Sequence, residues 1–62
     1  MNVDPNETLR LLRASAKDIA ETFDRDEEVA SADAAELASY VQALDEWITK
    51  GGFLPKEWEK RT

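Results

Sequence analysis

The chain has 62 residues, which is enough for one small domain. Fourteen acidic and eight basic side chains give a net charge of −6, which disfavours direct binding to nucleic acid or to anionic membranes. The absence of cysteine and histidine excludes disulfides and the usual structural zinc sites. A fold of this size must therefore be stabilised by a thin apolar core or by self-association.

The start of the sequence is acidic and poor in apolar residues, unlike a signal peptide, which begins basic and then becomes apolar. Nor does any apolar run approach the roughly 20 residues that a membrane span needs. We therefore expect a cytoplasmic protein that does not bind membranes.

A first helix is predicted over residues 5–23. Asp4 can act as its N-cap, Pro5 suits the first helical position, and Glu7 has approximate capping-box spacing to Asp4. Apolar residues then recur every three or four positions, which places one apolar stripe along the helix. The stripe consists of Leu9, Leu12, Ala16, Ile19 and Phe23. Leu11 lies off this stripe and indicates a second apolar contact.

Five consecutive charged residues, 24–28, end this pattern and predict a loop over residues 24–31. Asp24, Asp26 and Glu28 alternate like the first ligands of a helix–loop–helix calcium site. That site needs glycine at the position held here by Val29, and its bidentate glutamate would fall on Ala35. We therefore predict a solvated acidic loop and no bound metal.

A second helix is predicted over residues 32–50, with either Ser31 or Asp33 as its N-cap. Its apolar stripe has the same spacing and consists of Ala34, Leu37, Val41, Leu44 and Ile48. Tyr40 and Trp47 run beside this stripe and widen the apolar face.

Gly51 and Gly52 predict the end of the second helix, because either can adopt the left-handed conformation that closes a helix. If Gly52 does so, Phe53 can contact Ile48. Pro55 can then open a last short turn that brings Trp58 back toward the helices, within a folded-back tail at residues 51–60.

These elements predict an all-α fold, an antiparallel two-helix hairpin with a C-terminal tail packed back across one end. Two narrow helices leave apolar surface uncovered, so two hairpins could dimerise to a four-helix bundle.

No histidine is present to activate a serine, and no glycine-rich loop precedes a helix to hold a phosphate. We therefore predict that the chain is not an enzyme and holds no cofactor. The aromatic residues near the C-terminus can form core or can remain exposed as an anchor for a partner protein. The candidate partner-binding residues are Tyr40, Trp47, Phe53, Leu54, Trp58 and Leu11.

The predicted function is a small protein-binding or regulatory module that acts through this aromatic end and through acidic helix faces, which favour a basic partner. One alternative is an acidic nucleic-acid mimic that occupies the basic groove of a DNA- or RNA-binding protein. Another is a purely structural homo-oligomer, such as a homodimer.

Residues 43–58 contain an Asp-Glu-Trp triplet, a Gly-Gly-Phe-Leu-Pro run and a final Trp. This pattern resembles the C-terminal end of small acidic proteins of actinobacteria and their phages, for which no activity is known. The resemblance implies a bacterial or phage source. A phage source would favour a protein that binds and modulates a host component.

Overall fold

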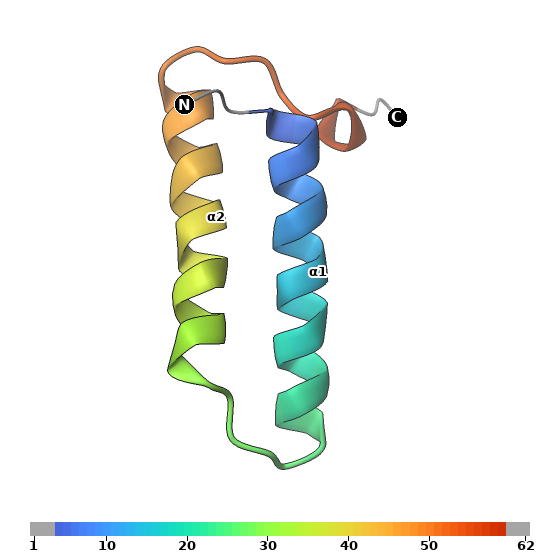
Figure 1. Cartoon of the computed structure of the whole chain (residues 1–62). Coiled ribbons are helices and arrows are strands. Elements are labelled where there is room, and N and C mark those ends of the chain that lie inside the picture. Colours follow the sequence, from blue (N-terminus) through green and yellow to red (C-terminus); the bar gives the residue numbers. More distant parts are fainter. Residues whose placement is uncertain (1–3, 60–62) are drawn as a thin grey trace.

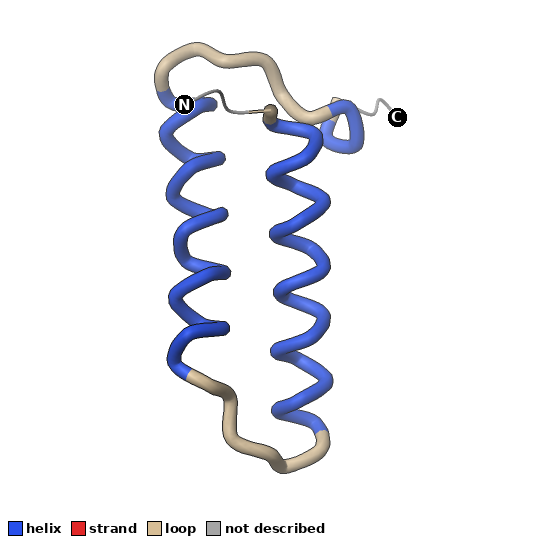
Figure 2. Tube along the Cα trace, viewed as in Figure 1, coloured by secondary structure: helices blue, strands red, loops and turns tan. Residues whose placement is uncertain are grey.

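The computed structural model describes residues 4–59, which form two α-helices and one short 3-10 turn. Helix α1 spans Pro5–Asp24, α2 spans Ser31–Thr49, and the turn η1 spans Lys56–Trp58. The two helices run antiparallel and pack against each other (Figure 1). Within the described residues all regular structure is helical (Figure 2). The all-α hairpin is therefore confirmed, and each helix begins and ends within one residue of its predicted bounds.

Asp4 caps α1 as the sequence predicts. Its carboxylate accepts hydrogen bonds from the backbone N–H groups of Asn6, at 3.0 Å, and Glu7, at 3.3 Å. The carboxylate of Glu7 accepts two bonds from the Arg10 guanidinium, at 3.0 and 2.5 Å. These bonds to Arg10 lower the pKa of Glu7. The start of α1 is thus stabilised by the Asp4 cap and by the ion pair between Glu7 and Arg10.

The predicted N-cap of α2 is wrong. Ala30 occupies that position, and no side chain caps the helix. The Ala30 carbonyl instead accepts bonds from the backbone N–H groups of Asp33 and Ala34, at 3.0 and 3.2 Å. The first turn is rich in alanine, the residue most favourable to helix, so α2 begins at Ser31 without help from a side chain.

Both helices end in the same hydrogen-bonding motif, in which a residue in the left-handed conformation reverses the chain. In α2 the Gly51 N–H binds the Ile48 carbonyl at 3.0 Å, and the Gly52 N–H binds the Trp47 carbonyl at 2.9 Å. This is the Schellman pattern, and Gly51, at φ 93°, is its left-handed residue. The condition under which Phe53 was expected to contact Ile48, a left-handed Gly52, is therefore not met.

Helix α1 stops in the same way, but without glycine. The Asp26 N–H binds the Phe23 carbonyl at 3.0 Å, and the Glu27 N–H binds the Thr22 carbonyl at 3.1 Å. Asp26 takes the left-handed position at φ 63°, a conformation that aspartate tolerates better than most residues.

The core is small and lies near the end of the hairpin where α1 begins. Leu9 and Leu44 are 2% and 3% exposed, and Pro5 and Pro55 are fully buried. Phe23, the last member of the predicted stripe, is 74% exposed, so its expected place in the core is wrong. It lies at the end of α1, and four of the six residues that connect α1 to α2 are charged.

The hairpin is a slab one helix layer thick, because its two helices pack side by side (Figure 1). Stable domains generally need two packed layers to enclose a core. The shape therefore explains why so few side chains are fully buried.

Candidate protein-binding surfaces

The segment after α2 is held by Trp47. Its indole N–H donates a hydrogen bond to the carbonyl of Phe53 at 2.8 Å. The two rings meet edge to face, with centroids 5.4 Å apart and planes at 86°. Gly52 lies directly against the indole, since a Cβ at that position would overlap ring atoms of Trp47. The glycine is therefore required by the close approach of the backbone to the ring.

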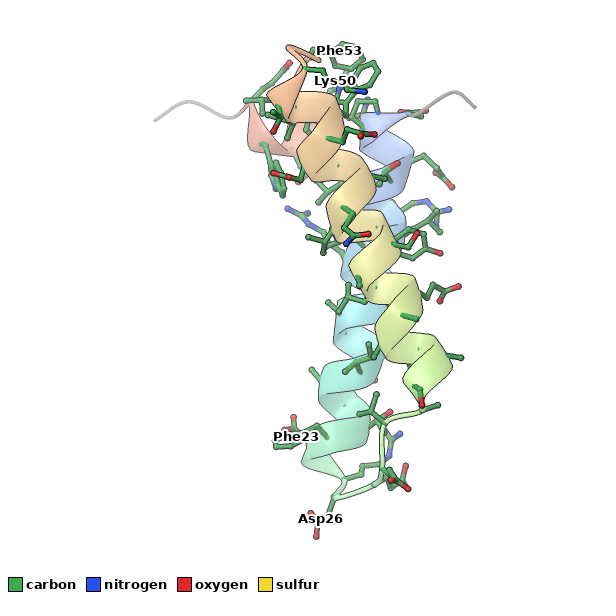
Figure 3. The ribbon with its side chains drawn as sticks, turned by 90° about the vertical axis from the view of Figure 1, so that its left-hand side faces the viewer. Phe23, Asp26, Lys50 and Phe53 are labelled. Carbon is green, nitrogen blue, oxygen red and sulfur yellow. The ribbon has the colours of Figure 1, made fainter. Side chains whose placement is uncertain are left out.

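Phe53 and Leu54 project from this support into solvent, at 60% and 39% exposure. We call Trp47, Phe53 and Leu54 the tip of the hairpin, and Figure 3 labels Phe53 at this end. The tip presents the exposed ring of Phe53. The Phe53 backbone is held by the Trp47 indole, which also lies against the ring.

The tail is fastened to the start of α1 after the tip. The backbone N–H of Lys56 donates to the side-chain oxygen of Asn6 at 2.7 Å, and Pro55 is buried beside this contact. Arg13 and Glu57 add an exposed ion pair at 3.6 Å. The tail therefore folds back as predicted, but onto the first turns of α1. The sequence analysis missed Asn6, because an asparagine in a first helical turn has no pattern that marks a distant partner.

A shallow hollow of about 360 Å³ lies at this contact between the tail and α1. Its lining residues are Asn6, Leu9, Arg10, Arg13, Lys56 and Glu57. The guanidinium groups of Arg10 and Arg13 are already paired with Glu7 and Glu57. We therefore assign this hollow to the tail contact and not to a ligand.

Trp58, on η1, borders an apolar groove of about 210 Å³ between the two helices. We call this the Trp58 groove, and its lining residues are Leu12, Val41, Leu44, Asp45, Ile48 and Trp58. Trp58 is 44% exposed and Val41 is 47% exposed. Trp58 thus returns to the helices as predicted, but it forms the wall of an open groove.

The predicted aromatic cluster is therefore divided. Phe53 belongs to the tip with Trp47, while Trp58 belongs to the groove. Tyr40 and Leu11 are half-buried on the helices and line neither the groove nor the hollow described above. Burial, and then the neighbouring carboxylate of Glu36, raise the pKa of the Tyr40 phenol.

The charge of the chain is concentrated at the end of the hairpin opposite the tip. Residues 14–42 hold eight acidic and two basic side chains, whereas residues 1–13 and 43–62 together hold six of each. The first range therefore accounts for the whole net charge of −6, and we call this part of the molecule the acidic half. Asp26 and Phe53 mark the two opposite ends in Figure 3. A partner that contacts both must span the length of the hairpin.

Comparison with family models, curated proteins and solved structures finds no match to this chain. The resemblance of residues 43–58 to actinobacterial and phage proteins therefore stays a prediction. None of the helices in residues 4–59 is both long and apolar enough to span a bilayer. In the same residues, no three or more carboxylates gather in a way that could hold a metal ion.

Proposed function

We propose that the chain is a non-enzymatic module that binds another protein through the tip, with Phe53 as the anchor. The observation that carries this proposal is a ring that is both exposed and fixed. Phe53 is 60% exposed, its carbonyl is bound by the Trp47 indole, and its ring lies against the indole edge to face. Aromatic residues supply a large share of the binding energy at protein interfaces.

The fixed geometry of the tip supports the same proposal. Ordering a flexible side chain on binding costs about 0.5–1.5 kcal/mol. Phe53 avoids part of this cost, because its backbone is held and its ring already lies against the Trp47 indole before the partner arrives. Leu54 extends the apolar surface beside it. The acidic half favours a partner that also has a basic region, which would increase the rate of encounter.

The test is affinity capture from a bacterial lysate with the purified chain immobilised, followed by quantitative binding to the captured protein. We expect the double substitution Phe53→Ser, Leu54→Ser to weaken binding by at least about 30-fold, the loss typical of an anchor residue. The control is Phe23→Ser, which removes an even more exposed ring at the other end of the hairpin. It should leave this binding unchanged.

Circular dichroism of both variants checks that the fold is intact. Retention of full affinity by the folded tip variant would overturn the proposal. Failure of the wild-type chain to retain any protein above background would count against it. The dissociation rate of a complex held by the tip should depend little on salt, because the tip carries no charge, and only the rate of encounter should fall as salt screens the acidic half.

A second candidate function rests on the acidic half. Its excess of six negative charges on one end of a helical rod suits an electrostatic mimic of nucleic acid that enters the basic groove of a DNA- or RNA-binding protein. Such binding would weaken steeply as salt rises, because the attraction is screened. It would also survive the tip substitutions and be lost on Asp24→Asn, Asp26→Asn, Glu28→Gln. One salt titration of the captured complex therefore separates the two functions.

A further inference from the structure

Phe23 and the Trp58 groove lie on the same side of the hairpin and at opposite ends of it. Figure 3 shows Phe23 projecting to the side on which η1, the turn that carries Trp58, is placed. Leu12 lies in the groove and precedes Phe23 by eleven residues, which is about 16 Å along the axis of α1. The chain thus presents an exposed ring and an open apolar groove on one face.

We propose that this face binds a second copy of the chain in an antiparallel, twofold-symmetric dimer, with Phe23 of each copy seated in the Trp58 groove of the other. The twofold axis passes near the middle of α1, midway between Leu12 and Phe23. One rotation fills both grooves and covers both rings, so the contact is closed and does not propagate into a filament. This contact is separate from the tip and does not rest on the proposed function.

The groove has the size and chemistry to take a phenyl ring. Its volume is about 210 Å³, and apolar cavities of about 150 Å³ already accept benzene. Five of its six lining residues are apolar, and Asp45 is the only charged one. Between Leu12 and Phe23, successive turns of α1 place Ala16 and Ala20 on this side. Their small side chains allow the two α1 helices to approach each other near the axis.

The distribution of charge selects the antiparallel orientation. A parallel pair would place one acidic half on the other. An antiparallel pair places each acidic half beside residues 4–13 and 43–59 of the other copy, which hold six acidic and four basic side chains. Like charges thereby stay apart along the length of the interface.

The solvent-accessible surface of the chain is large for its mass, which agrees with a hairpin that lacks a second layer of helices. A compact monomer of 7.0 kDa should expose about 4,000 Å², whereas this chain exposes 5025 Å². The excess is comparable to the roughly 800 Å² that each partner contributes to an interface of standard size. This area sets the scale of the surface that a second layer would cover. Stacking a second hairpin on the slab would produce a four-helix bundle.

The first test is sedimentation equilibrium of the wild-type chain, Phe23→Ser and Val41→Asp over a range of concentrations. We expect a wild-type dimer, and a dissociation constant at least about 30-fold higher for each variant. Because Phe23 is 74% exposed, Phe23→Ser should fold normally, which circular dichroism checks. The control Phe53→Ser removes an exposed ring from the tip and should leave the dimer intact. A wild-type monomer at millimolar concentration, or unchanged dimerisation of folded Phe23→Ser, would overturn the proposal.

The second test is an isotope-filtered NOE experiment on a dimer that combines labelled and unlabelled copies. We expect intermolecular NOEs from the Phe23 ring of one copy to the methyl groups of Leu12 and Val41 of the other. Intermolecular NOEs between the two Phe23 rings would show a parallel pair and overturn the arrangement. Added salt should strengthen the dimer, because it screens two copies of the same net charge.

Discussion

The two ends of the hairpin use the same helix stop and then diverge. At the acidic end, Asp26 reverses the chain, and Glu27 and Glu28, which follow it, are charged and exposed. At the tip, Gly51 reverses the chain, and the residues that follow return to the molecule. Within residues 4–59, the buried side chains gather toward this second end, among them Pro5 and Pro55.

This difference shows that the helix stop and the residues after it have separate effects on the path of the chain. The hydrogen-bonding pattern is the same in both places, so it reverses the backbone without deciding where the chain goes. After Gly51, the indole of Trp47 and the amide of Asn6 supply partners within reach. After Asp26, Glu27 pairs locally with Arg25 at 3.2 Å, which holds the loop close to its own helix.

The contact between Gly52 and Trp47 is where the tip should be most sensitive. We expect Gly52→Ala to lower the free energy of unfolding by about 2–3 kcal/mol, because the new methyl group would overlap the indole. Urea denaturation followed by circular dichroism measures this cost. In a Trp47→Leu background the same substitution should cost only a few tenths of a kcal/mol, since the overlap is gone. Equal costs in both backgrounds would contradict this explanation.

The tail contact with α1 should be weaker. We expect Asn6→Ala to lower the free energy of unfolding by about 1 kcal/mol and to speed hydrogen exchange at the Lys56 amide, because that N–H loses its acceptor. Asn6→Asp keeps an oxygen in place and should preserve the protection. Amides in the loop after α1 serve as the internal reference. Unchanged exchange at Lys56 in Asn6→Ala would rule out the bond.

A substitution at the helix stop of the acidic end should raise the free energy of unfolding, unlike the two changes above. We expect Asp26→Gly to raise the free energy of unfolding by about 0.5–1 kcal/mol, because glycine adopts a left-handed backbone with less strain. The matched change Gly51→Asp should lower it by a similar amount. Urea titration of the pair measures both effects. A loss of stability in Asp26→Gly would show that the aspartate side chain stabilises the turn.

Much of the fold could be predicted from local patterns. The cap at Asp4, the three-and-four spacing of the leucines and the glycine stop each depend on residues within a turn or two of each other. The hairpin follows from them. The N-cap of α2 could not be chosen, because Ser31 and Asp33 both had suitable side chains while the structure uses the backbone of Ala30.

The candidate surfaces were harder to predict, because they depend on contacts between distant segments. Phe23 has the spacing of a core residue, but it lies beside the charged connection and its ring is exposed. The aromatic residues were predicted to form one cluster, and the structure divides them. Their division between the tip and the Trp58 groove depends on where Lys56 meets Asn6, a contact with no signature in either local segment.

The bond between Asn6 and Lys56 joins positions fifty residues apart, yet it should form quickly. Once α1 and α2 have paired, the end of α2 already lies beside the start of α1, so only the short connection after Gly51 remains to be closed. Closing a ten-residue loop takes on the order of 10–100 ns. We therefore expect the tail to detach and return many times during the lifetime of the folded hairpin, so that the Trp58 groove gains and loses one wall without the helices melting.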